Sequence, residues 1–438
     1  MLLLFGVALP SRPAAADCYD LLGSWDLSSA SPDLQGSCRI RYGEGLTTGE
    51  LSTPDSKIGF SGLCGIGAFP FIETIRAGDL NIPAGFGLLT LRASADGQTL
   101  SGQLSGVSFV RTQFGTFTGI KYYAHDSPQI SGARVVWRRY SNEYDHSNSV
   151  QHTGEIMLQD GATLRRLTDN DMPDLDPQIS GTNIAWRGWD GKDHEIFFYN
   201  GSAITQLTND TKDDQPPQIS GSNVVWSDGA GAIYLDNGVT KTQITAGGGA
   251  DPKVSGNNVA WRASDGTRTQ IFLYNGVTVT QLTADTVKDK SAPQISGTNV
   301  VWSGVVDTYP EVYLYNGTIV TRLTNNSVED RLPHISGGNV AWVGVPTGSV
   351  YDEALLYDGT QIRQLSTTHV GLPEGAVQIS GTNVVWGNGN VIYFHNGTTA
   401  TPIMPGKWPR ISGSNVVSEN TYNIYFYNGS TTTQLTNN

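Results

Sequence analysis

Apolar and polar positions follow one pattern that recurs along most of the chain. Its clearest copy runs from Pro293 to Thr324 and reads PQISG, NVVW, a variable loop, EVYLYNG and TRLT. Four short apolar stretches separated by turns rich in Gly and Asn predict four β-strands in each copy. The Ile or Val of the first stretch marks eight copies, at Ile130, Ile179, Ile219, Val254, Ile295, Ile335, Ile379 and Ile411.

The length of the repeat predicts the fold. The copies follow one another about every 40 residues, which is the period of a four-stranded propeller blade. The second and third stretches are apolar on both faces, so neighbouring sheets must cover both sides of each sheet. The last copy ends without a polar capping unit, which favours a closed ring over an open stack. We therefore predict an all-β protein with one eight-bladed β-propeller, and seven blades as the alternative.

A Trp ends the second stretch in seven of the copies, and Ser418 replaces it in the eighth. These residues are Trp137, Trp186, Trp226, Trp261, Trp302, Trp342 and Trp386. A large aromatic residue that recurs so regularly at the end of an apolar strand is typical of a core. We predict that these side chains pack between blades and contact no ligand.

The first 120 residues lack the repeat. Residues 1–16 contain a short apolar run followed by three Ala residues, as in a secretory signal peptide. Residues 17–120 carry short alternating stretches broken by Gly, Asp and Ser, with an Asp-Gly hairpin turn in ADGQTLSGQL. They predict a small antiparallel β barrel or sandwich, so that the propeller occupies residues 121–438.

The three cysteines all precede the repeats, at Cys18, Cys38 and Cys64. Two of them are expected to pair in an oxidising compartment, and we predict a bond between Cys38 and Cys64. Lipid attachment at Cys18 is the open alternative for the odd cysteine, although Asp17 fits a lipoprotein cleavage site poorly.

The charge and hydropathy of the chain narrow the class of partner. The formal net charge is −13 and no basic run is present, so nothing favours nucleic acid or an anionic membrane. No apolar run is long enough to span a bilayer. We expect a monomer that is secreted, periplasmic or at the cell surface, with a protein or glycan ligand.

The order of Pro, Ser-Gly turn, apolar strand, Ile-Tyr-Leu-Tyr and Gln-Leu-Thr resembles the TolB-type propeller repeat. The resemblance covers about 310 residues, from Asp126 to Asn438. It departs from that family at the turn, where Ser296-Gly297-Thr298-Asn299 stands in place of Ser-Pro-Asp-Gly. TolB itself resembles a six-bladed propeller behind an α/β domain, so the resemblance implies the fold and not the role in envelope maintenance.

Loops that vary between copies predict one binding face. The loop between the second and third strands and the loop that leads to the next copy meet at the same end of a propeller. The residues that we expect to bind a ligand there are Asp174, Asp214, Asp330, Glu374, Arg187, Trp189 and Tyr309. The four carboxylates precede the first strand and predict a ring for a cation or basic ligand. In the alternative interpretation, each carboxylate satisfies backbone donors in its own turn.

Other candidate chemistry is weak. The segment Asp169–Asp176 resembles a calcium loop without the central Gly and closing Glu of an EF-hand, so calcium is the one cofactor considered. No His pair has metal-ligand spacing, and no Gly-x-Ser-x-Gly elbow is present. We expect a binding or scaffolding module at or outside the cell envelope, with no catalytic residues. The alternative is a glycoside or lactone hydrolase with carboxylates at the channel mouth.

Overall fold

The structure is a computed structural model. It describes the side chains of residues 124–140, 154–170, 172–284, 290–305, 308–346, 349, 351–367 and 377–437, and the backbone of eight strands between residues 23 and 121. The chain divides into two compact units: Met1–Tyr123 with Ser141–His152, and Ala124–Tyr140 with Thr153–Asn438. Among the described residues, no helix has the length and apolar character needed to cross a membrane.

The described strands of the first unit form one antiparallel sheet that closes on itself, because β1 pairs with both β2 and β8. The strands are β1 (Gly23–Ser28), β2 (Gly36–Gly43), β3 (Leu46–Ser52), β4 (Lys57–Gly62), β5 (Ala68–Ala77), β6 (Leu80–Ala93), β7 (Thr99–Ser108) and β8 (Thr116–Lys121). Only backbone pairing is described here, so the predicted small domain at residues 17–120 stays a prediction. The predicted Cys38–Cys64 bond lies outside the described side chains.

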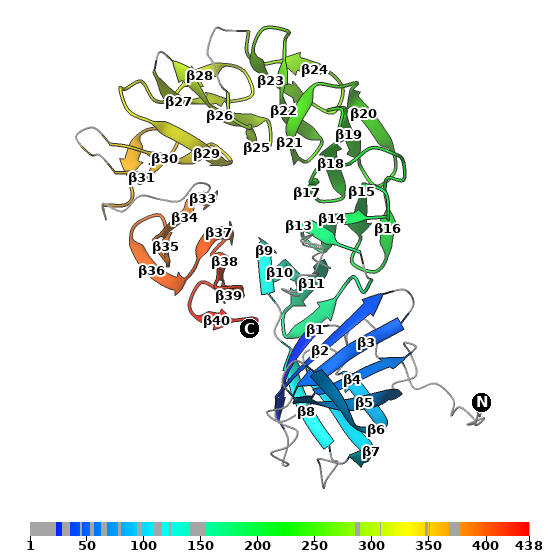
Figure 1. Cartoon of the computed structure of the whole chain (residues 1–438). Coiled ribbons are helices and arrows are strands. Elements are labelled where there is room, and N and C mark those ends of the chain that lie inside the picture. The colour runs from blue at the N-terminus through cyan, green and yellow to red at the C-terminus, as the bar shows by residue number, and fades with distance from the viewer. Residues whose placement is uncertain are drawn as a thin grey trace. The chain divides into compact units, whose positions relative to one another are not determined.

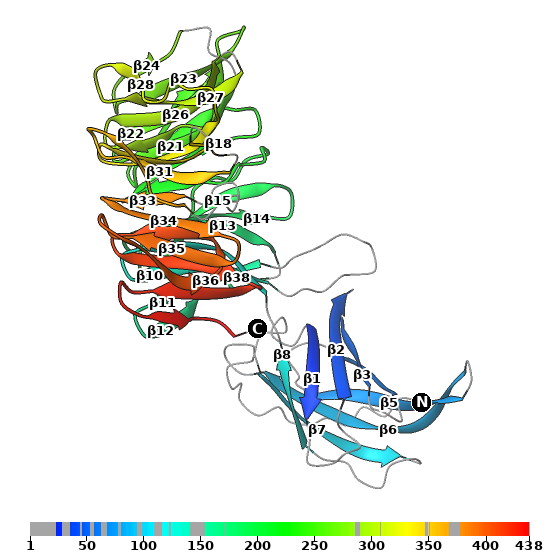
Figure 2. The same cartoon turned by 90° about the vertical axis from the view of Figure 1, so that its left-hand side faces the viewer.

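The second unit is a ring of eight four-stranded antiparallel sheets (Figure 1). In each sheet the first strand in the chain lies nearest the centre of the ring and the fourth lies outermost. When the ring is viewed from its edge, the strands run roughly along its axis (Figure 2). The described residues therefore confirm an eight-bladed propeller, and the seven-blade alternative is wrong.

The strands of the first four blades are β9 (Ala124–Ser131), β10 (Arg134–Tyr140), β11 (Gly154–Asp160), β12 (Thr163–Arg166); β13 (Asp174–Ser180), β14 (Asn183–Trp189), β15 (His194–Tyr199), β16 (Ile204–Gln206); β17 (Gln218–Ser220), β18 (Asn223–Ser227), β19 (Ile233–Asp236), β20 (Lys241–Thr245); and β21 (Gly249–Ser255), β22 (Asn258–Ser264), β23 (Thr269–Tyr274), β24 (Val279–Gln281).

The strands of the last four blades are β25 (Gln294–Ser296), β26 (Asn299–Val306), β27 (Tyr309–Tyr315), β28 (Val320–Arg322); β29 (Asp330–Ser336), β30 (Asn339–Gly344), β31 (Glu353–Tyr357), β32 (Ile362–Gln364); β33 (Gln378–Ser380), β34 (Asn383–Asn388), β35 (Val391–His395), β36 (Ala400–Pro405); and β37 (Lys407–Ser412), β38 (Asn415–Asn420), β39 (Asn423–Tyr427), β40 (Thr432–Gln434).

The core lies between the blades and is built around the recurring Trp residues. Trp302 is 1% exposed and stacks on Tyr313, with ring centroids 5.9 Å apart and planes 7° apart. It packs against Ala260, Ile271 and Leu273 of the preceding blade. All seven of these Trp side chains are at most 2% exposed. The prediction that they are core residues is confirmed.

The Ser-Gly turn joins each blade to its neighbour. Gly181 N donates to Ser131 Oγ of the preceding blade at 2.8 Å, and the equivalent bonds of all eight turns measure 2.8–2.9 Å. The Asn that follows the turn adds a second bond in seven blades, such as Asn183 Nδ2 to Gly221 O at 2.8 Å. The turn Gly has φ near +60°, where L side chains are strained. The motif therefore fixes the spacing of the blades around the ring.

Candidate binding site at the loop end of the propeller

The two ends of the propeller differ in their connections. The short Ser-Gly turns lie at one end, and antiparallel pairing places the loops after the second and fourth strands at the other end. We refer to the latter as the loop end. The structure describes the side chains of all the site residues predicted from the sequence except Glu374. The described ones lie near this end of the blades.

The acidic positions before the first strand are internal to the ring and not on its rim. Asp174 is 4% exposed and its Oδ1 accepts a hydrogen bond from Trp186 Nε1 at 2.7 Å. Asp330 is 1% exposed and accepts from Trp342 Nε1 at 2.6 Å. A carboxylate here satisfies the indole N–H of the buried Trp, which explains why acidic residues recur at this position. Their burial takes them out of reach of a ligand on the surface.

Other members of this set show the same internal position. His125 occupies it in the first blade, and its Nδ1 accepts from Trp137 Nε1 at 3.0 Å. Asp214 is 1% exposed, and burial raises its pKa to about 7. Glu374 lies outside the described residues.

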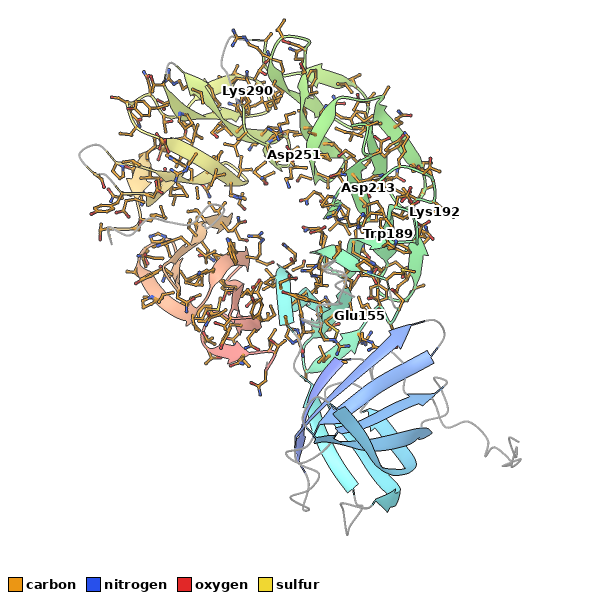
Figure 3. All side chains as sticks on the ribbon, viewed as in Figure 1. Glu155, Trp189, Lys192, Asp213, Asp251 and Lys290 are labelled. Atoms are coloured by element: carbon orange, nitrogen blue, oxygen red, sulfur yellow. The ribbon has the colours of Figure 1, made fainter. Side chains whose placement is uncertain are left out.

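A second buried carboxylate begins the third strand of several blades. Glu155, marked in Figure 3, accepts a hydrogen bond from Thr168 Oγ1 at 2.7 Å and one from Asn170 N at 3.2 Å. Asn170 Nδ2 in turn donates to Asp174 Oδ2 at 3.0 Å, which links two neighbouring blades. Burial raises the pKa of Glu155 to about 7 and that of Asp174 to about 6. These networks stabilise the junctions between blades.

Ion pairs line the inner edge of the ring in the first, second and fourth blades. Arg187 Nε donates to Asp176 Oδ2 at 2.5 Å, and Arg262 makes the same contact with Asp251 at 2.5 Å. Both Asp residues precede a Pro at a β-bulge and have φ near +54°. Asp251 lies at the inner edge of the ring in Figure 3. Asp176 therefore holds Arg187 within its own blade, and the ligand contact predicted for Arg187 stays a prediction.

The eighth blade lacks this ion pair, and a cavity of about 330 Å³ lies beside it. Trp408 takes the position of Asp176 at the bulge, with φ 48°, and Glu419 takes the position of Arg187. The cavity is lined by Asp126, Ser127, Pro128, Gln129, Tyr140, Trp408, Arg410 and Glu419. These residues come from β9, β10, β37 and β38, so the cavity lies where the first and last blades meet. Trp408 is 47% exposed and presents a large aromatic surface at this place.

The two carboxyl groups in the cavity, those of Asp126 and Glu419, have different partners. Arg138 pairs with Asp126, with Nε and Oδ1 2.8 Å apart. Burial and the charge of Asp126 raise the pKa of Glu419, a backbone hydrogen bond with Ser127 and the charge of Arg138 lower it, and the net result is a pKa of about 7. Glu419 therefore gains or loses a proton near neutral pH, and it lies beside Asp126, which is paired with Arg138.

The remaining predicted residues lie elsewhere. Trp189 ends β14 and packs edge-to-face against His194, with centroids 5.0 Å apart. Tyr309 begins β27 and is 38% exposed. Neither residue lines the cavity.

In the segment that resembles a calcium loop, three carboxylates bond to other side chains of the protein. Asp169 pairs with Arg166, Asp174 bonds to Trp186 and Asp176 pairs with Arg187.

Sequence reasoning missed the residues of the cavity. The signal was a departure from the repeat: Lys407-Trp408-Pro409-Arg410 and Ser418-Glu419 differ from the residues at the same positions of other blades. That departure indicates a site only when the first and last blades are known to be adjacent. Hydrophobic patterning alone does not identify a cavity whose lining residues lie about 280 positions apart in the sequence.

Comparisons with known proteins find similar solved structures and no matching family. No protein-family model matches the sequence, and no curated protein matches it. Solved structures similar to it include the β-propeller domain of the Trilobed protease from Pyrococcus furiosus, with 11% identity, 64% of this chain and 95% of that chain covered, and a TM-score of 0.48.

Two further similar structures are an acylaminoacyl peptidase from Pyrococcus horikoshii, with 11% identity, 64% and 52% coverage and a TM-score of 0.46, and TolB from Acinetobacter baumannii, with 15% identity, 74% and 82% coverage and a TM-score of 0.35. The chain spans about half the length of the peptidase. The expectation of a TolB-like propeller is confirmed at the level of the fold by the eight sheets of the structure itself.

Proposed function

We propose that the protein is a binding module whose ligand is a glycan, held at the loop end of the propeller beside Trp408. The observation that supports this most directly is the exposed indole of Trp408 next to the 330 Å³ cavity. Large exposed aromatic residues beside a concave site with a few polar groups are typical of ligand-binding sites.

The size and chemistry of the cavity favour a sugar ring. Its volume is at the lower end of the range for small-molecule sites, about 300–1,000 Å³. Trp408 and Tyr140 provide apolar ring surface, while Asp126, Arg410 and Glu419 provide hydrogen-bond acceptors and donors. A sugar ring has one apolar face and a rim of hydroxyl groups, so it matches both. A peptide side chain from a protein partner is the competing ligand.

Export to the periplasm or cell exterior remains part of the proposal. Its support is the composition of residues 1–16 and the placement of all three cysteines before residue 65.

A glycoside hydrolase is the second candidate, on the basis of Glu419 and Asp126. A carboxyl group with a pKa near 7 can act as a general acid at neutral pH, and glycoside hydrolysis uses such a group beside a second carboxyl group. Both groups line the same cavity. Because both functions would use the same cavity, one experiment can test whether the protein only binds the glycan or also hydrolyses it.

The experiment is a glycan array probed with the purified chain and with Trp408→Ala. We expect a defined set of glycans to bind the native protein and to be lost with the variant. Each positive glycan is then incubated with the protein, and its products are analysed by mass spectrometry. Release of a shorter glycan would assign the hydrolase function instead. Binding that is identical in Trp408→Ala, or binding to peptide arrays only, would contradict the proposed site or its ligand.

A further inference from the structure

Three carboxylates converge at the loop between β14 and β15 of the second blade, in a part of the molecule not used by the cavity. They belong to Asp190 and Asp193 of the loop and to Glu195 of β15. One carboxylate oxygen from each lies within 4.8 Å of one from each of the others. Two oxygens bound to the same calcium ion at 2.3–2.6 Å lie at most about 5 Å apart. The spacing therefore allows all three residues to bind one ion.

Two of these carboxylates are buried with an oxygen that accepts no hydrogen bond, although the Thr208 side chain also acts on Glu195. Glu195 is 0% exposed; its Oε1 accepts from Asp210 N at 2.8 Å. Asp193 is 8% exposed. Within the described part of the chain, Glu195 Oε2 and Asp193 Oδ1 have no hydrogen-bond partner. Buried oxygens of this kind are costly unless a donor or a cation reaches them.

Two basic residues near this loop, His194 and Lys212, bond to other carboxylates. His194 pairs with Asp213 at 2.7 Å, and Lys212 pairs with Asp228 at 2.5 Å. Figure 3 marks Trp189, Lys192 and Asp213 in this region of the ring. In the residues that the structure describes, no salt bridge reaches Asp190, Asp193 or Glu195. The charge of Lys192 in the same loop acts on Asp190 and Asp193, so three carboxylates face one nearby cation that offsets only part of their negative charge.

The other blades lack this arrangement, although several keep the buried Glu. Glu155 of the first blade occupies the position of Glu195, but its Oε2 accepts from Thr168 at 2.7 Å. Glu311 of the fifth blade receives Arg322 on Oε1 at 3.0 Å; its Oε2, like that of Glu195, has no hydrogen-bond partner among the described residues, but no loop carboxylates gather beside it. The second blade alone, among the described residues, adds two loop carboxylates to the Glu that several blades hold at this position.

We propose that Asp190, Asp193 and Glu195 bind one calcium ion. An all-oxygen set of three carboxylates suits a hard divalent cation, and neither a thiolate nor an imidazole is part of the group. Asp190 is exposed, so the ion can enter from solvent and keep water as further ligands. Its charge balances most of the three negative charges at this place.

The ion would join the loop to the strand that follows it. Asp190 Oδ1 already accepts hydrogen bonds from Lys192 N at 2.8 Å and from Asp193 N at 3.2 Å, which bends the loop toward β15. A ligand from the loop and one from β15 would fix that bend. Trp189 precedes the loop directly, so the position of its indole at the loop end would depend on calcium.

The test uses the full purified chain after treatment with a chelator, titrated with calcium chloride by calorimetry. We expect one ion per chain with a Kd of about 10⁻⁴ to 10⁻³ M, as in extracellular modules, and a melting temperature that rises by about 2 °C or more at saturation. Asp193→Asn and Glu195→Gln should each weaken binding at least about tenfold. Asp190→Asn changes an exposed residue and tests the site even if a buried variant fails to fold.

Glu155→Gln is the matched control, because it removes a buried carboxylate from the same position of another blade. It should leave calcium binding and stoichiometry unchanged. Absence of saturable calcium binding to the native chain would overturn the proposal. Binding that survives unchanged in Asp190→Asn and in Asp193→Asn would also overturn it, because the ion would then lie elsewhere.

Discussion

Gly132 N donates a hydrogen bond to Ser412 Oγ at 2.9 Å, although 280 positions of the chain separate the two residues. Asn415 Nδ2 returns a bond to Gly132 O at 2.8 Å. The same pair of contacts joins neighbouring blades elsewhere, as between Ser296 and Gly337 at 2.8 Å. The junction between the first and last blades is therefore built like the other junctions of the ring. Beneath it, Val135 and Trp137 pack against Val417 and Ile424.

Equal junctions predict equal sensitivity to mutation. Ser412→Ala and Ser296→Ala each remove one acceptor of an exposed backbone N–H, so each should lower the free energy of unfolding by about 0.5–1.5 kcal/mol. Chemical denaturation of both variants measures the difference. A neutral Ser412→Ala beside a destabilising Ser296→Ala would mean that the ring is open in solution between its first and last blades.

Replacing Trp302 and replacing Trp189 should change the free energy of unfolding by different amounts. Trp302 is buried between blades, so Trp302→Ala should cost about 3–5 kcal/mol through lost burial and a cavity. Trp189 lies at the end of β14 against His194, and Trp189→Ala should stay within about 0.5 kcal/mol of the native protein. Thermal melts of the two variants provide the measurement. A similar loss in both would show that Trp189 is also a core residue.

The buried carboxylate network predicts a dependence of stability on pH. The pKa of Glu155 is raised from 4.5 to about 7 in the folded chain, so its contribution is fully present below pH 4.5 and is lost as the pH rises through 7. Glu155→Gln removes that loss, and Gln270 already fills the same position in the fourth blade with a 2.6 Å bond from Thr283.

The free energy of unfolding of Glu155→Gln, relative to the native chain, should therefore rise by about 1–3 kcal/mol between pH 5 and pH 8. Taking the difference between the two proteins at each pH cancels the titration of groups that do not interact with Glu155, such as the buried His125, whereas Asp174 is coupled to Glu155 and contributes to the difference. A difference that stays constant over this range would show that Glu155 is ionised throughout.

Much of the fold was predictable from the sequence because it depends on local patterns of apolar and turn residues, and these occur in eight copies. Val300, Val301 and Trp302 are apolar on both faces and indicate a covered strand, and the structure buries all three. The role of Asp174 was not predictable in the same way. Its partner, Trp186, lies 12 positions away, and the sequence does not say which of several nearby donors a carboxylate will reach.

The candidate site was even less accessible to sequence reasoning. Trp408 and Asp126 line the same cavity only because the ring closes, and nothing in the local sequence of either one indicates the other. The predicted residues Arg187 and Asp330 have the chemistry of ligand contacts, but Asp176 and Trp342 already satisfy them. Partners within the fold decide which polar residues remain available.

The cysteine prediction concerns side chains outside the described residues. Cys38 and Cys64 should be bonded in the mature protein, because the export that we propose would supply an oxidising compartment. A non-reducing peptide map by mass spectrometry should contain one peptide pair joined through them. Two free thiols, or a bond that includes Cys18, would contradict the prediction.

The central claim is that the cavity between the first and last blades binds the ligand. The most direct measurement is calorimetric titration of the strongest array glycan into the native chain, Trp408→Ala and Trp189→Ala, with melting temperatures recorded for each. The account predicts a loss of affinity of at least about tenfold in Trp408→Ala with an unchanged melting temperature, because an exposed indole contributes contact and not core packing. It predicts native affinity in Trp189→Ala. Full affinity in Trp408→Ala, or a loss confined to Trp189→Ala, would contradict it.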